Sequence, residues 1–356
     1  MWTTEMRFCR SAVSRITKIT DEPFETAERP RPSAAFGSKT NSIMKAISNL
    51  IIFMGLGLCS LALTGCDDDY LHPIVYPEYQ PDQTVGGDDT PLPEPDDSEL
   101  YKVVAHRGGS TEAGTSTYPD NSKASLSYAI QLGCYASECD IYWTKDNQVV
   151  VAHATDGCLI NGLKPWEHTF AELQTAGKLA NGELLPSLES FIETVMTSGT
   201  TRLWLDVKRI EVDGVTSNTA ESIKACTRAI EIIEEMKAQN FCEFIVSGNT
   251  TIWNGCYPAA QSAGITCGWM SYSSPTDYLA YLNSWANIDY SYFFSGTSAV
   301  ANPRYTLQSY IDAEVELSVF NADTDVEISY ILAYYDDMKA ICSNYPSKLI
   351  EKIKNR

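Results

Sequence analysis

The chain is 356 residues long, which allows one to three domains, and its apolar and aromatic content is ordinary for a globular protein with a sizeable core. Its formal net charge of −20 argues against nucleic-acid binding, because a surface that binds a phosphate backbone needs clustered Lys and Arg. An acidic protein can still bind a phosphate group if it holds a metal cation beside it. The charge is unevenly spread, since residues 67–99 contain eleven acidic residues and no Lys or Arg.

The N-terminal region carries a targeting signal. Residues 1–43 are polar, without an apolar period, and we interpret them as an over-long gene start before initiation at Met44. Residues 44–65 have a short positive start, an apolar stretch and small residues at the end, which is typical of a secretory signal. Their ending, Leu-Thr-Gly followed by Cys66, resembles the bacterial lipobox, in which the cysteine is lipidated. The alternative is a transmembrane helix, but the run is short and interrupted by small residues.

Residues 66–99 form an acidic linker with six prolines. This composition cannot bury enough apolar surface to fold, so it predicts an extended, self-repelling tether. The acidic residues directly after Cys66 are either a surface-export signal or a solvated spacer. We therefore expect an exported protein, lipid-anchored to a bacterial membrane on the periplasmic or surface face of the outer membrane. Eight cysteines follow Cys66; export permits disulfides, and no Cys/His spacing predicts a zinc site.

Residues 100–356 have the length of one barrel-sized domain. Short apolar runs predict strands at Lys102–Ala105, Tyr135–Ile141, Arg202–Val207, Glu243–Val246, Thr266–Met270, Tyr290–Phe294, Glu316–Phe320 and Ala340–Cys342, with a short additional strand at Val149–Ala152. Amphipathic stretches predict helices at Ser122–Leu132, Leu188–Thr197, Ala220–Gln239, Thr276–Leu282, Arg304–Asp312 and Val326–Asp337. Eight strands alternating with helices predict a parallel α/β fold, namely a closed (β/α)8 TIM barrel.

The first candidate site residues follow the first predicted strand, where the carboxyl ends of barrel strands form the active face. His106 can exchange protons near neutral pH, and Arg107 offers a planar fork to a phosphate. The glycines at 108 and 109 allow close backbone approach. A His-Arg pair alone is weak evidence, because such a pair is more often structural than catalytic.

A pair of acidic residues marks the second predicted strand. Side chains alternate along a strand, so Glu138 and Asp140 share one face and Cys139 points away. Two carboxylates this close are unfavourable unless a cation lies between them, and oxygen ligands suit Mg²⁺ or Ca²⁺. The alternative, a solvated strand edge, is disfavoured because the surrounding residues are mostly apolar or small.

Two later strands add further candidates. His153 ends an apolar run that we expect to return as a hairpin toward the strand of Glu138 and Asp140. Asp206 and Lys208 share one face of another strand, where a carboxylate can complete a metal site and an ammonium can neutralise a phosphate oxygen.

Taken together in chain order, these features resemble the glycerophosphodiester phosphodiesterase family. Its pattern of HRG, an EN-type motif, E-x-D, T-x-D with H-D, and E-x-K corresponds here to His106-Arg107-Gly108, Asp120-Asn121, Glu138-Cys139-Asp140, Thr144-Lys145-Asp146 with His153, and Asp206-Val207-Lys208. Its P-x-L-x-E segment and its later S, W-x-x-N and T-D-x-P motifs correspond to Leu185-Pro186-Ser187-Leu188-Glu189, Ser247, Phe320-Asn321 and Ser343-Asn344-Tyr345-Pro346. The resemblance spans Tyr101–Arg356.

Four positions depart from the family pattern. Asp120 stands where Glu is usual, Ala154 replaces the Asp after the second His, Asp206 replaces a Glu ligand, and Phe320 replaces a Trp. The His, Arg, Lys and carboxylate set is complete nevertheless. We therefore expect an active enzyme with an altered substrate preference.

The resemblance implies the chemistry of the site. Its metal ligands are Glu138, Asp140 and Asp206, which hold one divalent ion, Ca²⁺ or Mg²⁺. Its substrate-binding groups are Arg107 and Lys208, which stabilise charge on the reacting phosphate. Its general acid and base are His106 and His153, in an order that the sequence leaves open.

The implied function is hydrolysis of small-molecule glycerophosphodiesters to an alcohol and glycerol phosphate. Two other interpretations stay open. One is a related barrel phospholipase, of the phosphatidylinositol phospholipase C or sphingomyelinase D kind. The other is a non-catalytic surface lipoprotein that binds phosphorylated ligands. The replacements at Ala154 and Asp206 are the reason to retain this second interpretation.

Overall fold

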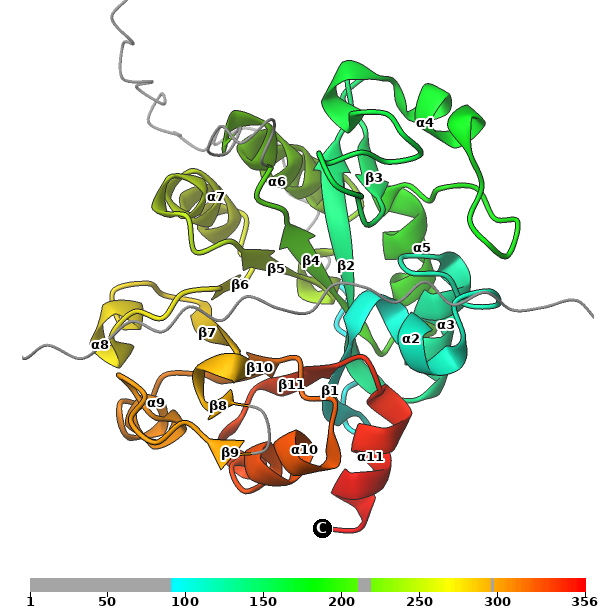
Figure 1. Ribbon diagram of the computed structural model, residues 1–356. Coiled ribbons are helices and arrows are strands. Elements are labelled where there is room, and N and C mark those ends of the chain that lie inside the picture. Colours follow the sequence, from blue (N-terminus) through cyan, green and yellow to red (C-terminus); the bar gives the residue numbers. More distant parts are fainter. Residues whose placement is uncertain (1–90, 211–218, 296–297) are drawn as a thin grey trace, which may run out of the picture. The chain divides into compact units, whose positions relative to one another are not determined.

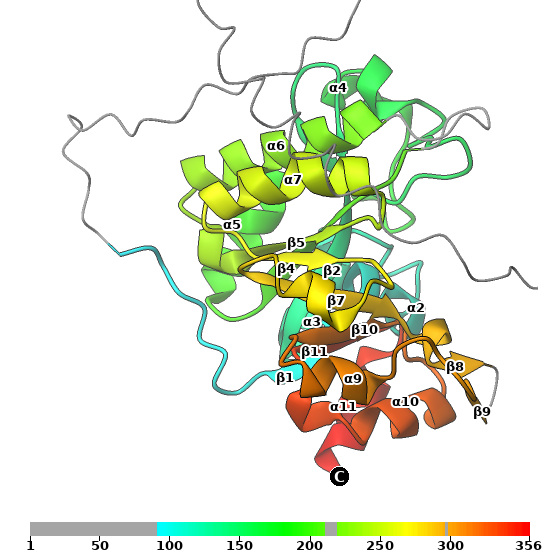
Figure 2. The same cartoon turned by 90° about the vertical axis from the view of Figure 1, so that its left-hand side faces the viewer.

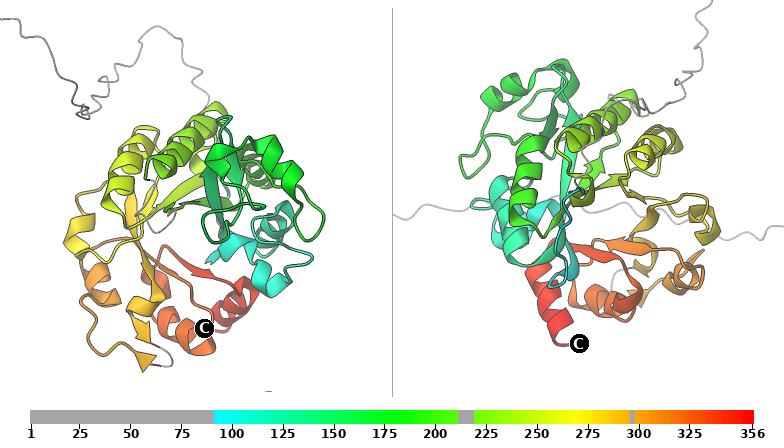
Figure 3. Two further views of the ribbon diagram at one scale, coloured as in Figure 1. Left: turned by 45° about the horizontal axis from the view of Figure 1, so that its top comes forward. Right: turned by 180° about the vertical axis from the view of Figure 1, so that it is seen from behind.

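The computed structural model describes residues 91–210, 219–295 and 298–356, and these form a closed parallel β-barrel inside a ring of helices (Figures 1 and 3). The predicted (β/α)8 TIM barrel is confirmed. The predicted signal segment, Cys66 and most of the linker lie outside the described residues. Within the part of the chain that is described, no helix is long and apolar enough to cross a membrane.

Eight strands build the barrel: β1 (Tyr101–Ala105), β2 (Cys134–Trp143), β4 (Arg202–Val207), β5 (Cys242–Val246), β6 (Cys267–Trp269), β7 (Ser284–Asp289), β10 (Leu317–Phe320) and β11 (Ala340–Ser343). Each pairs in parallel with its neighbours in the order β1-β2-β4-β5-β6-β7-β10-β11, and β11 pairs with β1 to close the ring. The predicted hairpin is confirmed, because β3 (Val149–Val151) runs antiparallel to the end of β2. A short hairpin of β8 (Phe294–Ser295) and β9 (Ser298–Ala299) lies outside the barrel sheet.

The helices lie around the outside of the barrel (Figure 2). They are α2 (Ser110–Ala113), α3 (Lys123–Gln131), α4 (Phe170–Ala176), α5 (Leu188–Ser198), α6 (Thr219–Glu235), α7 (Thr250–Ser262), α8 (Pro275–Tyr278), α9 (Leu307–Asp312), α10 (Asp325–Leu332) and α11 (Pro346–Lys354), with single 3-10 turns at His106–Gly108, Pro165–Glu167, Gln239–Phe241, Tyr290–Tyr292 and Tyr335–Asp337. Several begin at a side-chain cap, as α3 does at Ser122 and α10 at Thr324, because such an oxygen satisfies a free backbone N–H of the first turn.

The strands separate two packed layers. Outward side chains such as Cys139 and Leu205 are fully buried in the large cluster between barrel and helices. Inward side chains such as Trp204 and Trp285 fill the barrel itself, with their rings 5.1 Å apart. Cys139 therefore points away from the two acidic residues that flank it, as predicted from strand alternation.

A polar network fills the amino-terminal end of the barrel. Glu243 accepts hydrogen bonds from the Trp204 indole at 2.5 Å and the Tyr135 hydroxyl at 3.1 Å, and Lys339 Nζ lies 2.9 Å from its carboxylate. The Lys339 ammonium also lies 4.7 Å from the centre of the Trp285 ring. This end is thus filled by paired charges and aromatic rings, and the opening lies at the other end.

The predicted strand at Tyr290–Phe294 is wrong. The strand is β7, and Tyr290–Tyr292 is a 3-10 turn after it. Asn287, which faces the barrel interior, interrupts the apolar run of β7, whereas Tyr290 and Tyr292 after the strand pack against the large apolar cluster between barrel and helices.

Other departures concern helices. The predicted helix at Thr276–Leu282 is a single turn, Pro275–Tyr278, and the prediction at Val326–Asp337 covers α10 and a separate 3-10 turn. Helix α7 was not predicted, because Gly255 and Pro258 are helix breakers. Gly255 is required by packing: a Cβ there would approach the side chain of Ile223 on α6 to 2.5 Å. Helices α6 and α7 accordingly lie side by side (Figure 2).

Two further observations bear on the sequence predictions. Seven of the eight cysteines in the described residues are buried free thiols, and Cys158 is partly exposed. Residues 91–99, at the end of the predicted linker, have no helix or strand but contact the barrel: Asp96 N donates to Gly199 O at 2.8 Å, and Asp97 pairs with Arg202 at 3.1 Å.

Candidate active site

The carboxyl ends of the barrel strands surround a cavity of about 460 Å³. Its lining residues come from all eight barrel strands and the loops after them, and they are His106, Arg107, Glu138, Trp204, Asp206, Lys208, Arg209, Ile245, Ser247, Met270, Asn287, Phe320, Asn321 and Cys342. Charged side chains cluster on β1, β2 and β4, whereas the strands opposite contribute neutral ones. The cavity therefore has one charged wall and one neutral wall.

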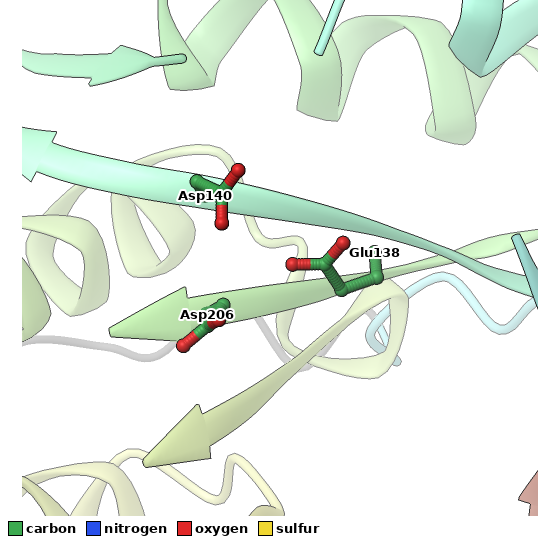
Figure 4. Close-up of side chains that lie close together, drawn as sticks. All are labelled: Glu138, Asp140 and Asp206. Carbon is green, nitrogen blue, oxygen red and sulfur yellow. The ribbon is translucent and has the colours of Figure 1, made fainter. Parts of the chain in front are cut away.

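Three carboxylates form the centre of the charged wall. Glu138 and Asp140 lie on the same face of β2, and Asp206 lies beside them on the neighbouring β4 (Figure 4). One oxygen of each lies within 4.8 Å of the other two, and the residues are only 4%, 0% and 8% exposed, respectively. Three buried carboxylates at this spacing require compensating positive charge.

Two side chains supply part of that charge. Lys208 Nζ lies 2.5 Å from Asp140 Oδ1 and also contacts Asp206 Oδ2. Arg107 Nε lies 3.3 Å from Asp140 Oδ2, and its Nη1 lies 3.2 Å from Asp120 Oδ2. Asp120 thus holds the guanidinium despite being shorter than the usual Glu.

Asn121 fixes Asp140 from the other side. Its Nδ2 donates to Asp140 Oδ2 at 2.8 Å, and its Oδ1 accepts from the Asp140 backbone N–H at 3.0 Å. Asn121 has a positive φ of 58°, a conformation that asparagine tolerates better than most residues. The motif at 120–121 therefore orients the neighbours of the acidic centre.

The pKa values show how the charges are balanced. Burial, and then repulsion from Asp140, raises the pKa of Glu138 well above its usual 4.5, and burial also raises the pKa of Asp206. Burial acts on Asp140 in the same direction, but Lys208 and Arg107 outweigh it and lower the pKa of Asp140. The two cations thus stabilise one carboxylate fully, and the other two would be stabilised by a further positive charge.

The residues present fit a divalent ion. Asp206 Oδ1 is buried and, among the described residues, has no hydrogen-bond donor. A buried carboxylate oxygen without a partner is strongly destabilising, and a cation would satisfy it. Carboxylate oxygens without nitrogen or sulfur ligands suit Mg²⁺ or Ca²⁺. The structure thus brings together the three residues predicted as ligands.

His106 is oriented by a chain of hydrogen bonds. Its Nδ1 lies 2.7 Å from Asn344 Oδ1, and Asn344 Nδ2 donates to Asp323 Oδ2 at 2.8 Å. Because the Asn344 amide already donates to a carboxylate, its oxygen is the acceptor, and neutral His106 carries its proton on Nδ1. The unprotonated Nε2 lies on the side of Glu138, 3.8 Å from Oε2. Burial and the neighbouring Arg107 lower the pKa of His106.

The loop that carries His106 and Arg107 is tightly packed. Arg107 and Gly108 have positive φ values of 50° and 81°, and a Cβ on residue 108 would come within 2.5 Å of Ser125. Glycine is therefore required at 108. The Arg107 backbone N–H donates to Glu138 Oε2 at 2.9 Å, so the turn also fixes a carboxylate.

His153 lies at the edge of the site. It follows β3, and the Ala152 backbone N–H donates to Asp140 O at 3.0 Å, so the hairpin returns it to the acidic strand. The side chain is exposed and is not among the residues that line the cavity. Partial burial lowers the pKa of His153, and Asp140 is the strongest of the charges that act on it. Its role as the second acid–base group stays a prediction.

Sequence reasoning assigned no role to Asn121, Asn344 or Asp323, although the first two fall in the quoted motifs. Asn287 had no signal, because a polar residue in a strand resembles a loop position. Each becomes significant only through contacts between strands that are distant in sequence.

A parallel barrel with a buried acidic centre, an oriented imidazole and two flanking cations is an arrangement typical of enzymes that act on phosphate esters. Residues 106–242 match the family model described as the glycerophosphoryl diester phosphodiesterase family. The resemblance drawn from the motifs is thereby confirmed over this region.

Solved structures of this class share the fold. A glycerophosphodiester phosphodiesterase from Parabacteroides distasonis is 20% identical, covers 72% of this chain and 98% of its own, and has a TM-score of 0.57. An Oleispira antarctica phosphodiesterase, solved in complex with the product sn-glycerol-3-phosphate, is 23% identical over 72% of this chain and 97% of its own, with a TM-score of 0.52. No curated protein matches the chain.

Proposed function

We propose that this protein is a metal-dependent phosphodiesterase that cleaves glycerophosphodiesters to an alcohol and glycerol phosphate. The observation that carries the proposal is the buried trio of Glu138, Asp140 and Asp206, with a partnerless oxygen, beside the oriented imidazole of His106. The family match over residues 106–242 supports it, as does the similar Oleispira structure that holds sn-glycerol-3-phosphate.

In this mechanism the protein's own groups place charge and protons around phosphorus. A bound divalent ion would neutralise a phosphate oxygen. Arg107 and Lys208 are held rigidly by Asp120, Asp140 and Asp206, so they face the developing charge without reorganising. His106 presents an unprotonated Nε2 to the cavity and accepts a proton there, and His153 serves the opposite side of the phosphate.

The ion that fits the trio best is a hard cation, and we propose Ca²⁺ or Mg²⁺. Titration of the metal-free protein with each ion, followed by calorimetry and by turnover, distinguishes them. A requirement for Zn²⁺ that neither ion replaces would contradict the assignment.

The substrate class is tested with a panel of diesters. The purified full-length chain, supplied with Mg²⁺ or Ca²⁺, should release alcohol and glycerol phosphate from glycerophosphocholine, glycerophosphoethanolamine or glycerophosphoglycerol. Cleavage of phosphatidylinositol or of sphingolipids with no cleavage of this panel would identify a related barrel phospholipase instead. Binding of the panel without turnover would identify a ligand-binding lipoprotein.

We also propose that the protein acts at a membrane surface, anchored through lipidated Cys66. The proposal rests on the lipobox-like ending of residues 63–66. Metabolic labelling with a fatty acid should mark the wild type, and Cys66→Ala should lose the label and be released from the membrane fraction. Cys59→Ala, which lies outside the motif, is the matched control. Equal labelling of wild type and Cys66→Ala would contradict lipidation at this position.

A further inference from the structure

The neutral wall of the cavity contains an asparagine whose amide is locked in one orientation. Asn287 is on β7, which is four strands from β2 in either direction around the barrel, so it faces the acidic centre from the opposite wall. Asn287 is only 2% exposed, and it is paired with Ser318 in the neighbouring strand β10. The Asn287 amide is therefore a buried polar group at the wall of the binding cavity.

A hydrogen-bond chain fixes this amide. The Trp285 indole N–H donates to Ser318 Oγ at 2.7 Å, and Ser318 Oγ lies 2.8 Å from Asn287 Oδ1. An indole can only donate, so Ser318 accepts from it and gives its single hydroxyl hydrogen to Asn287 Oδ1. The NH₂ group of Asn287 must then point away from Ser318. Among the described residues, none accepts a hydrogen bond from Asn287 Nδ2.

The packing that supports this chain is tight. Trp285 and Ser318 are fully buried, and Gly268 on β6 makes room for the indole, since a Cβ there would lie 2.5 Å from the Trp285 ring. Asn287 Nδ2 is not one of the buried partnerless atoms, so it is accessible from the cavity, where water or a ligand oxygen can accept its hydrogen bond. The barrel thus holds a donor in place for an oxygen atom that enters the cavity.

Two neighbouring groups on the same wall complement this donor. Asn321 Oδ1 is buried and has no donor among the described residues, so it can accept a hydrogen bond. Ser247 Oγ accepts from the Asn249 backbone N–H at 3.3 Å, which leaves its hydroxyl hydrogen to donate. The other residues of this wall, Ile245, Met270 and Phe320, are apolar. No cavity-lining residue of this wall is charged.

We propose that this wall is the subsite for the glycerol arm of the substrate, with Asn287 as the residue that determines specificity for its hydroxyl groups. Hydroxyls both donate and accept, and this wall offers two donors and one acceptor, whereas an anionic phosphate belongs at the wall of Arg107 and Lys208. The inference rests on the proposed function for the identity of the substrate, but it assigns the residues from geometry alone.

The test compares two ligands that differ only in the hydroxyls, sn-glycerol-3-phosphate and n-propyl phosphate. Their dissociation constants are measured by calorimetry on the purified full-length chain with Mg²⁺ or Ca²⁺ supplied. The wild type should bind glycerol phosphate about tenfold or more tightly than propyl phosphate, because a site built to hydrogen-bond a hydroxyl rejects the analogue without it.

Asn287→Leu is the decisive variant. It removes the amide donor and offers no hydrogen-bonding group in its place, so the preference for glycerol phosphate should fall to about twofold or less. Asn287→Ala should give the same loss of preference, and Asn254→Leu, on the exposed face of α7, should keep the wild-type ratio.

An unchanged ratio in both Asn287 variants, or a wild type that binds the two phosphates equally or neither of them, would overturn the assignment. Thermal unfolding of each variant establishes that it is folded. A wild type that shows the preference but cleaves none of the glycerophosphodiesters would leave the subsite in place and contradict the proposed function.

Discussion

Replacing Asp206 by Asn tests the acidic centre most sharply, because it removes one charge and almost no volume. Asp206 Oδ2 contacts Lys208, whereas Oδ1 is buried without a donor and is free for an ion. An amide has only one oxygen for these two tasks. If that oxygen turns to Lys208, the NH₂ group faces the ion and repels it.

The size of the effect follows from Coulomb's law. A dication about 3 Å from the centre of a carboxylate is attracted by about 3 kcal/mol even at the dielectric constant of water, and by about 11 kcal/mol at an effective value of about 20. The lower figure corresponds to a loss on the order of 10²-fold in metal affinity. The amide oxygen recovers part of this, so we predict that Asp206→Asn weakens metal binding by at least about tenfold.

The assay is calorimetric titration of metal into the chelated protein, with turnover measured on the same samples. Asp206→Glu keeps the charge and restores the family's usual length, so it should retain substantial activity. Its preference between Ca²⁺ and Mg²⁺ should shift, because the two ions differ in their geometric demands. Asp312→Asn, an exposed carboxylate on α9, is the matched control. Wild-type metal affinity in Asp206→Asn would show that Asp206 is not a ligand.

Three further predictions follow from the geometry. His106→Ala and His153→Ala should each lower kcat by about 10²–10⁴ with little change in Tm, and a variant that unfolds but is fully active per folded molecule would show a structural histidine. Metal should raise Tm more at pH 8 than at pH 5. The pKa values of Glu138 and Asp206 are raised in the chelated fold, so their protonation stabilises that fold fully below their usual pKa values of 4.5 and 3.8, and this stabilisation is lost as pH rises through the raised pKa values. A shift in Tm on metal binding that does not depend on pH would contradict the account. Glu243→Leu should lower the free energy of unfolding by about 3–5 kcal/mol in urea titrations, because it leaves Lys339 without its partner. The kcat of the folded fraction should stay unchanged, because Glu243 lies at the end of the barrel opposite the cavity.

The barrel could be predicted where a strand keeps a core of apolar residues around a single acidic one, as in residues 202–207 with Asp206 or 242–246 with Glu243. Prediction failed at β7, where Asn287 is a polar residue facing a cavity, and at α7, where Gly255 is required by contact with α6. In both places tertiary contacts decide the local structure. Local patterns alone cannot show which neighbour a side chain meets.

The acidic centre was accessible from sequence because the alternation of side chains along a strand places Glu138 and Asp140 on one face. The groups that orient it were not. His106 and Asn344 are 238 positions apart, and the hydrogen bond that fixes the Asn287 amide comes from Ser318 on another strand. Such partners are defined by the closure of the barrel and not by any spacing along the chain.

The central claim is that the carboxylate trio binds a divalent ion needed for phosphodiester hydrolysis. Its most direct test is the rate of alcohol release from glycerophosphocholine by the full-length chain before chelation, after chelation, and after Mg²⁺ or Ca²⁺ is restored. We predict that activity disappears on chelation and returns with the ion. Full activity in the metal-free protein would contradict the account.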